Sequence, residues 1–318
     1  MKRALICGVG GQDGGYLAQL LLSKGYQVFG TSRDIQISRF ENLVALGIRS
    51  EVALHSMAVN DFRSVLSVIN KTQPDEIYNL TGQSSVALSF EQPVETLESI
   101  AIGTINLLEA IRFLERPIHF YNAGSSECFG DTNGLPADEN TPFRPRSPYA
   151  VSKATAFWGV ANYREAYGMF CCSGILFNHE SVFRPERFVT KKITSAAARI
   201  AQGSKEKLVL GNLDVHRDWG WAPEYVEAMW LMLQQATADD FVIATGHTHS
   251  LSDFVDEAFQ ACGLNWRDHV ESSAQFRRPT DIKIGAANPA HAKDKLGWVA
   301  KSGMKDVVRM MVQSSLHP

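Results

Sequence analysis

A glycine-rich turn, Gly8-Val9-Gly10-Gly11-Gln12-Asp13-Gly14, lies near the N-terminus between two segments of different periodicity. Before it, Arg3–Cys7 is a short apolar run, typical of a buried strand. After it, apolar residues recur at helical spacing over Tyr16–Leu22, and Gly25 ends this pattern before a second apolar run at Gln27–Gly30. A strand, a glycine turn, a helix and a second strand form a βαβ unit, which requires parallel strands.

The same alternation continues along the chain. Further strands are predicted at Val52–His55, Glu76–Leu80, Ile118–Asn122 and Cys172–Leu176, with helices around Val65–Ile69, Ile102–Leu114 and Tyr149–Lys153. The pattern predicts an α/β fold, a doubly wound parallel sheet of the Rossmann type. After residue 178, prolines and charged residues interrupt this alternation of strands and helices. A further helix is predicted in this part of the chain, at Tyr225–Gln235. We therefore expect a Rossmann domain over residues 1–177 and a smaller substrate-binding lobe over residues 178–318, and a crossover of the chain back to the first domain stays open.

Charge and cysteine content narrow the class of protein. Lysine and arginine total 31 against 34 acidic residues, a formal net charge of −3, so no basic surface for nucleic acid or an anionic membrane is expected. No apolar stretch approaches the ~18 residues of a membrane span. The five cysteines include no CxxC motif. We expect reduced thiols, no metal site and a cytoplasmic location.

The glycine turn predicts a dinucleotide site. Gly8, Gly11 and Gly14 form a GxxGxxG pattern that opens a helix, where free N–H groups can hold a pyrophosphate, and Gln12 and Asp13 belong to the same turn. The alternative is a tight turn without a ligand. Arg33, at the end of the second strand, favours a 2′-phosphate and hence NADP over NAD, although Asp34 beside it would repel that phosphate unless it points away or binds Arg39.

A second motif joins Tyr149 and Lys153, which lie four residues apart and so on one helix face. The lysine ammonium can stabilise a phenolate, so that Tyr149 acts as a base near neutral pH. With Ser125 upstream as the hydroxyl that holds a substrate oxygen, the arrangement is similar to that of short-chain dehydrogenases/reductases. An exposed helical Tyr/Lys pair is the structural alternative.

Glu127 stands two residues after Ser125. Hydride transfer to or from an alcohol does not need this carboxylate, whereas movement of a second proton does. Glu127 is equally compatible with a structural role at a helix N-terminus, and the local residues alone do not separate the two interpretations.

The whole chain resembles the GDP-mannose 4,6-dehydratase family. The resemblance rests on the segments Gly8–Tyr16, Asn79–Phe90, Ser125–Gly130, Pro142–Lys153, Asn162–Gly168, Gly174–Ser181, Phe188–Thr194, Leu210–Trp230 and Arg278-Pro279. It implies a Rossmann domain that holds NADP and a second lobe that closes over a GDP-sugar. The chain departs from the family pattern at Asp34, Ala58, Gly82, Gly124, Ser125, Val182–Pro185 and Asp281.

The resemblance also implies residue roles. Tyr149 would take the proton of the sugar 4-hydroxyl, Ser125 would hydrogen-bond that oxygen, and Glu127 would remove the C5 proton and protonate the departing 6-hydroxyl. Tightly bound NADP would accept the C4 hydride and return it to C6. The cofactor residues implied are Gly8, Gly11, Gln12, Asp13, Gly14, Arg33, Tyr149, Lys153 and His179. The substrate residues implied are Gln83, Ser84, Asn178, Val189, Lys192, Arg217, Arg278 and Asp281.

Three other functions stay open at this point. A dehydratase of another GDP-sugar, such as a GDP-heptose, would keep every catalytic group. A nucleotide-sugar epimerase or reductase would need Tyr149 and Lys153 without Glu127. A non-enzymatic cofactor-binding regulator is suggested only by Asp34 and Ala58. The family resemblance further implies a homodimer or homotetramer whose interface includes the helices at Ile102–Leu114 and after Tyr149.

Overall fold

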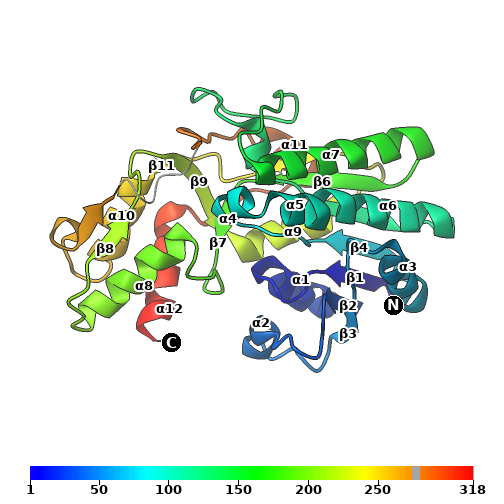
Figure 1. Ribbon diagram of the computed structural model, residues 1–318, viewed down its shortest axis with the longest axis horizontal. Coiled ribbons are helices and arrows are strands. Elements are labelled where there is room, and N and C mark those ends of the chain that lie inside the picture. The colour runs from blue at the N-terminus through cyan, green and yellow to red at the C-terminus, as the bar shows by residue number, and fades with distance from the viewer. Residues whose placement is uncertain (274–279, 318) are drawn as a thin grey trace.

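The central feature of the fold is a parallel sheet of seven strands. In the computed structural model, which describes residues 1–273 and 280–317, the strand order is β10-β6-β5-β4-β1-β2-β3 (Figure 1), and every neighbouring pair is parallel. The strands are β1 (Arg3–Cys7), β2 (Gln27–Ser32), β3 (Ala53–Ser56), β4 (Glu76–Asn79), β5 (His119–Ala123), β6 (Cys171–Leu176) and β10 (Phe241–Ile243). The predicted doubly wound Rossmann sheet is confirmed.

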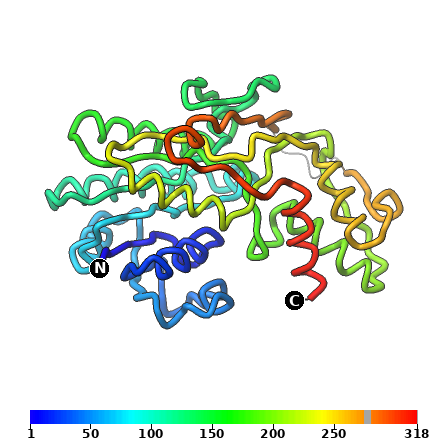
Figure 2. Tube along the Cα trace, turned by 180° about the vertical axis from the view of Figure 1, so that it is seen from behind, coloured from blue at the N-terminus to red at the C-terminus, as the bar shows by residue number. Residues whose placement is uncertain are grey.

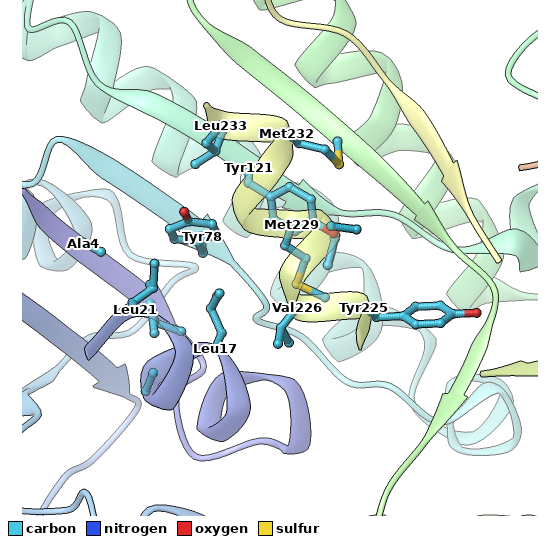
Figure 3. Packing of buried hydrophobic residues seen from close by; sticks show 14 of the residues in the cluster. Ala4, Leu17, Leu21, Tyr78, Tyr121, Tyr225, Val226, Met229, Met232 and Leu233 are labelled. Carbon is cyan, nitrogen blue, oxygen red and sulfur yellow. The ribbon is translucent and has the colours of Figure 1, made fainter. Parts of the chain in front are cut away.

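Helices cover both faces of this sheet. On one face, α1 (Gln12–Ser23), α9 (Ala222–Leu233) and α11 (Ala290–Leu296) share a core with the strands; Figure 3 shows Leu17 and Met229 packed near Tyr78 and Tyr121. On the other face, α3 (Phe62–Thr72), α6 (Gly103–Leu114) and α7 (Pro148–Tyr167) contribute Val65, Leu107 and Val160 to a second core. Strands β4 and β6 are buried along their whole length, as expected for a sheet covered on both sides.

Several short helical segments were not predicted. They are α2 (Glu41–Ala45), α4 (Val86–Glu91), α5 (Pro93–Leu97) and the π-helical turn η1 (Glu98–Ile102), which continues into α6. Segments of five or six residues are too short to show an amphipathic period, so hydrophobic spacing cannot reveal them.

The second lobe has its own core. Helices α8 (Val189–Ala201), α10 (Leu251–Gln260) and α12 (Met304–Leu316) pack with the parallel pair β8 (Leu208–Leu210) and β12 (Val270–Ser272), and a 3-10 turn, η3 (Trp266–Asp268), precedes β12. A three-stranded sheet of β7 (Asn178–Glu180), β9 (His216–Trp221) and β11 (Thr248–Ser250) begins directly after the Rossmann strands. Across the described ranges, none of the helices has the length and apolar character that a membrane span requires.

The chain returns to the first lobe after entering the second. Strand β10 pairs with β6, and α9 and α11 lie in the core of the Rossmann sheet, although all three come after residue 178. Figure 2 shows the segment that contains α11 running over the first lobe before α12 reaches the second, and a bridge between Ala137 and Ala287 holds it there. We propose that the first lobe comprises residues 1–177 together with α9, β10 and α11, and that the other residues after 177 form the second lobe.

Candidate active site

The glycine turn joins β1 to α1 with very close backbone packing. A Cβ atom on Gly14 would lie 2.5 Å from the Gly8 carbonyl oxygen, and one on Gly8, whose φ is +88°, would lie 2.9 Å from the Leu80 carbonyl oxygen. Helix α1 begins after Gly11 with no side-chain cap. Its first N–H groups are therefore available to an anionic group, and the turn fits the pyrophosphate of a dinucleotide.

The catalytic candidates come from two neighbouring elements. Ser147 caps α7, because its side chain accepts a hydrogen bond from the Ala150 N–H at 3.1 Å, and this start places Tyr149 and Lys153 one turn apart. Lys153 Nζ donates to the Ala123 carbonyl oxygen at 2.7 Å and lies 5.9 Å from the centre of the Tyr149 ring. Ser125 follows β5, and its Oγ accepts from the Glu127 N–H at 3.3 Å.

Burial shifts both groups of the Tyr149–Lys153 pair toward their neutral forms. Burial raises the pKa of Tyr149 above its ordinary value, while hydrogen bonding with Ser125 opposes the shift. Burial also lowers the pKa of Lys153 to about 8. Lys153 is therefore still mostly protonated at pH 7 and can stabilise a phenolate only below about pH 8.

Glu127 lies in a 3-10 turn, η2 (Ser126–Phe129), directly after Ser125. Its neighbour Cys128 is buried, and burial raises the pKa of that thiol to about 12, so it stays protonated. Glu127, Ser125, Tyr149 and Lys153 all line one cleft of about 630 Å³. The structure thus brings a carboxylate into the same cleft as the predicted hydroxyl, phenol and ammonium groups.

His179 links the glycine turn to the start of the second lobe. Its Nδ1 donates to the Phe177 carbonyl oxygen at 2.7 Å, and its Nε2 lies 2.9 Å from Asp13 Oδ2. Because both ring nitrogens face oxygens that accept, the geometry favours the doubly protonated imidazolium. Gln12 reinforces the link, since its Nε2 donates to the His179 carbonyl oxygen at 3.1 Å and its Oε1 accepts from Ser181 at 2.7 Å.

Two residues of this network, Arg184 and Thr190, were not singled out as site residues from the sequence, whereas the family resemblance placed Glu180 with His179 beside the nicotinamide end. Glu180 is buried, accepts from Arg184 Nε at 2.6 Å and accepts from Thr190 at 2.8 Å. Arg184 also donates to the His179 carbonyl oxygen. Glu180, Arg184 and Thr190 all line the cleft. The only local sequence feature that indicates the Glu180–Arg184 ion pair is their four-residue spacing, and this spacing is weak evidence for a contact outside a helix.

Two predicted substrate cations are anchored by backbone carbonyls. Arg217 donates to the Ile282 carbonyl oxygen at 2.8 Å and pairs with Asp281 at 3.3 Å. Lys192 Nζ donates to the Val209 carbonyl oxygen at 2.8 Å. These contacts hold the Lys192 and Arg217 side chains in the lining of the cleft, and ammonium and guanidinium groups suit phosphate oxygens.

The other predicted substrate residues are distributed as follows. Gln83, Ser84, Asn178, Val189 and Asp281 line the same cleft. The Gln83 amide folds back on its own loop, since its Nε2 donates to the Ser85 carbonyl oxygen at 2.7 Å. Arg278 lies outside the described residues.

The predicted cofactor residues fall into two groups. Asp13, Tyr149, Lys153 and His179 line the cleft, whereas Gly8, Gly11, Gln12, Gly14 and Arg33 do not. Arg33 pairs instead with Glu95, its Nη2 lying 2.8 Å from Glu95 Oε1. Asp34 does not bind Arg39, because its Oδ1 accepts from the Gln36 N–H and Arg39 faces Glu41. Among residues 1–273 and 280–317, no group of three or more His, Cys, Asp or Glu side chains is arranged to hold a metal.

A Rossmann sheet with an uncapped glycine turn, and with Ser125, Tyr149 and Lys153 in one cleft, defines an enzyme of the short-chain dehydrogenase/reductase class. The family model described as GDP-mannose 4,6 dehydratase matches residues 5–311. The chain belongs to the GDP-mannose 4,6-dehydratase family.

Relatives of this family match the chain from end to end. A GDP-mannose 4,6 dehydratase of Arabidopsis thaliana is 47% identical, with 99% of this chain and 90% of the relative aligned. A GDP-mannose 4,6-dehydratase of Yersinia enterocolitica is 42% identical, with 100% of this chain and 94% of the relative aligned.

Solved structures share the fold at lower identity. A dTDP-glucose 4,6-dehydratase from Bacillus anthracis in complex with NAD has a TM-score of 0.86 at 17% identity, covering 99% of this chain and 96% of that one. A UDP-glucose 4-epimerase from Thermus thermophilus in complex with NAD has a TM-score of 0.86 at 24% identity, covering 98% of each chain. These likenesses establish the two-lobed fold.

Proposed function

We propose that the protein converts GDP-D-mannose into GDP-4-keto-6-deoxy-D-mannose and water, as a hydro-lyase with tightly bound NADP. The observation that carries the proposal is the position of Glu127 in the same cleft as Ser125, Tyr149 and Lys153. An epimerase or a simple reductase has no use for this carboxylate, whereas elimination of water needs a group that moves a second proton.

Each side chain has a separate task in the proposed reaction. Tyr149, helped by the Lys153 ammonium, takes the proton of the sugar 4-hydroxyl, and Ser125 donates a hydrogen bond to the same oxygen. NADP, when held by the residues of the first lobe, would supply the hydride chemistry at the sugar. Once C4 is a ketone, Glu127 removes the C5 proton and delivers it to the 6-hydroxyl, which leaves as water. A proton then returns to C5.

The second lobe supplies the proposed GDP site. Lys192 and Arg217 carry positive charges that face the cleft from α8 and β9, and guanidinium and ammonium groups suit phosphate oxygens. Asn178 and Val189 would line the nucleotide pocket, Gln83 and Ser84 would contact the sugar, and Asp281 would meet the ribose. Arg278 belongs to the same proposed set on sequence grounds.

The first lobe supplies the proposed NADP site. The uncapped start of α1 suits the pyrophosphate, His179 and Asp13 lie where the turn meets the cleft, and Arg33 follows β2 at the position where an arginine can meet a 2′-phosphate. Gly8, Gly11 and Gly14 would allow the close backbone approach, and Gln12 would hold the turn against the second lobe.

We further propose a homodimer or homotetramer in the cytoplasm. An apolar face of exposed side chains covers the neighbouring helices α6 and α7 and the turns before α6: Val94, Leu97, Ile102, Phe113, Val151, Trp158 and Tyr167. Phe113 and Trp158 are 65% and 61% exposed, which favours burial against a second copy. The five cysteines are unpaired, as suits a reducing compartment.

The proposed activity is tested directly by incubating the purified protein with GDP-mannose and recording the product mass. Loss of one water with no net change of added NADP supports the proposal. GDP-heptose in a parallel incubation tests the closest alternative substrate. If neither sugar loses water, the dehydratase function is wrong.

The proposed interface is tested by light scattering on Trp158→Glu. This charge should lower the mass of the assembly. Leu135→Glu is the matched control, since Leu135 is an exposed apolar residue of the segment between η2 and α7 and belongs to neither α6 nor α7. Equal masses for the wild type and Trp158→Glu would contradict this interface.

A further inference from the structure

The ion pair between Arg33 and Glu95 joins two segments that follow strands of the Rossmann sheet. Arg33 follows β2, and Glu95 lies in α5, which comes after β4. Strands β2 and β4 are the two neighbours of β1, so the pair joins the segments on either side of the strand that leads into the glycine turn. A dinucleotide in a doubly wound sheet binds outside the carboxyl ends of these strands.

Arg33 occupies the position that reads the adenosine ribose. After the second strand of a βαβ unit, a carboxylate binds the ribose hydroxyls of NAD, whereas an arginine accommodates the 2′-phosphate of NADP. Here Arg33 already forms an ion pair with a carboxylate, because Arg33 Nη2 and Glu95 Oε1 are 2.8 Å apart. The two side chains are 78% and 42% exposed, so the pair is weak and can open when an anion competes.

We propose that Glu95 determines the selectivity of this chain between NADP and NAD by competing with the 2′-phosphate for Arg33. The inference rests on the dinucleotide site of the proposed function. A 2′-phosphate that reaches Arg33 must displace Glu95 and then lies close to the displaced carboxylate, which repels it. NAD carries a hydroxyl at this position and meets no such repulsion. Glu95 therefore lowers the affinity for NADP while leaving that for NAD nearly unchanged.

The backbone around Glu95 prevents the carboxylate from moving far away. The next residue, Thr96, is buried, its Oγ1 donates to the Gln92 carbonyl oxygen at 2.7 Å, and it also accepts from Gln83 Nε2 at 3.4 Å. Helix α5 also packs against α7 and leads directly into η1. These contacts hold the backbone at Glu95, so its carboxylate stays within side-chain reach of Arg33 when the ion pair opens.

Asp34 is a neighbouring acid with a different orientation. Its Oδ1 accepts from the Gln36 N–H at 2.8 Å, and its carbonyl oxygen accepts from Ser38 Oγ at 2.6 Å. These contacts direct Asp34 into its own turn. The carboxylate that faces Arg33 is that of Glu95.

The test measures dissociation constants of NADP⁺ and NAD⁺ by quenching of tryptophan fluorescence, after removal of any dinucleotide that copurifies. Glu95→Gln should tighten NADP⁺ binding roughly tenfold and change NAD⁺ binding little, as one screened charge contact predicts. In an Arg33→Gln background, Glu95→Gln should have a smaller effect on NADP⁺ binding, because the competition for Arg33 is absent and only the direct repulsion of the 2′-phosphate remains. Glu98→Gln, an exposed acid of η1, is the matched control and should leave both constants unchanged.

An unchanged ratio of the two constants in Glu95→Gln would overturn the inference. A selectivity change produced by Asp34→Asn and not by Glu95→Gln would also overturn it. Both results presuppose dinucleotide binding, and thus leave the proposed function standing. A wild-type protein that binds neither dinucleotide would instead overturn the proposed function itself.

Discussion

His179 Nε2 lies 2.9 Å from Asp13 Oδ2, although the two residues are 166 positions apart in the sequence. Asp13 belongs to the first turn of α1. His179 belongs to β7, the first strand after the chain leaves β6 of the Rossmann sheet and enters the second lobe. The ion pair therefore holds the glycine turn against the segment that also carries Glu180, Arg184 and Thr190. The proposed cofactor and substrate sides of the cleft meet at this contact.

Removal of the Asp13 charge should change how stability depends on pH. Burial of Asp13 opposes ionisation, but His179 outweighs it and holds the pKa of Asp13 at about 2. Burial of His179 is likewise outweighed by Asp13, which raises the pKa of His179 above its ordinary value of 6.5. The stabilisation that ionised Asp13 provides is complete above its ordinary pKa and is lost as pH falls toward 2. The stabilisation that protonated His179 provides is complete below pH 6.5 and is lost as pH rises through its raised pKa.

The difference in unfolding free energy between the wild type and Asp13→Asn should thus be largest between about pH 4 and pH 6.5. Urea denaturation of the cofactor-free protein across pH 3 to 9 measures this difference. A difference that stays constant over the whole range would contradict the ion pair.

Glu127→Gln should separate oxidation from elimination. The amide cannot remove the C5 proton, so turnover should fall by a factor between about a hundred and ten thousand, while NADPH absorbance still appears when GDP-mannose is added. Glu186→Gln is the control, since Glu186 lies at the rim of the same cleft and pairs with Arg199. Normal turnover by Glu127→Gln would refute the elimination role.

Gly14→Ala should destabilise the protein by about 2 kcal/mol or more and abolish dinucleotide binding, because the new Cβ would lie 2.5 Å from the Gly8 carbonyl oxygen. Gly10→Ala is a matched control in the same turn, where the nearest atom would be a Phe40 ring carbon at 3.5 Å. Thermal unfolding and NADPH fluorescence report the two effects. Equal behaviour of the two variants would mean that the close packing of the turn is not needed.

The pH profile of kcat/KM should show a decrease at alkaline pH that reflects deprotonation of Lys153. Burial lowers its pKa to about 8, so the ammonium that assists Tyr149 is lost above that pH and kcat/KM should fall. Lys153→Arg keeps a positive charge at high pH, and its profile should lack this alkaline decrease even if its rate is lower. The same decrease in both proteins would assign it to another group.

Local spacing explains how much of the fold and the site was predictable. The strands from Arg3–Cys7 to Cys172–Leu176 and the helix that carries Tyr149 and Lys153 follow from hydrophobic periodicity and capping residues, and these elements appear in the structure close to the predicted bounds. The return of β10 to the sheet was left open by the sequence, because a strand of three residues shows no period and its partner β6 lies far earlier in the chain.

By itself, then, the sequence determined the glycine turn, the Tyr149–Lys153 spacing and the neighbourhood of Ser125 and Glu127, because each depends on residues within one turn or one helix. Only the tertiary structure decided that His179 pairs with Asp13, that Arg33 is occupied by Glu95 and that Arg217 is anchored by the Ile282 carbonyl. The physical reason is that these contacts join segments 166, 62 and 65 residues apart. Which charged side chains pair depends on which helices, strands and loops the fold brings together. Local sequence patterns do not contain this information.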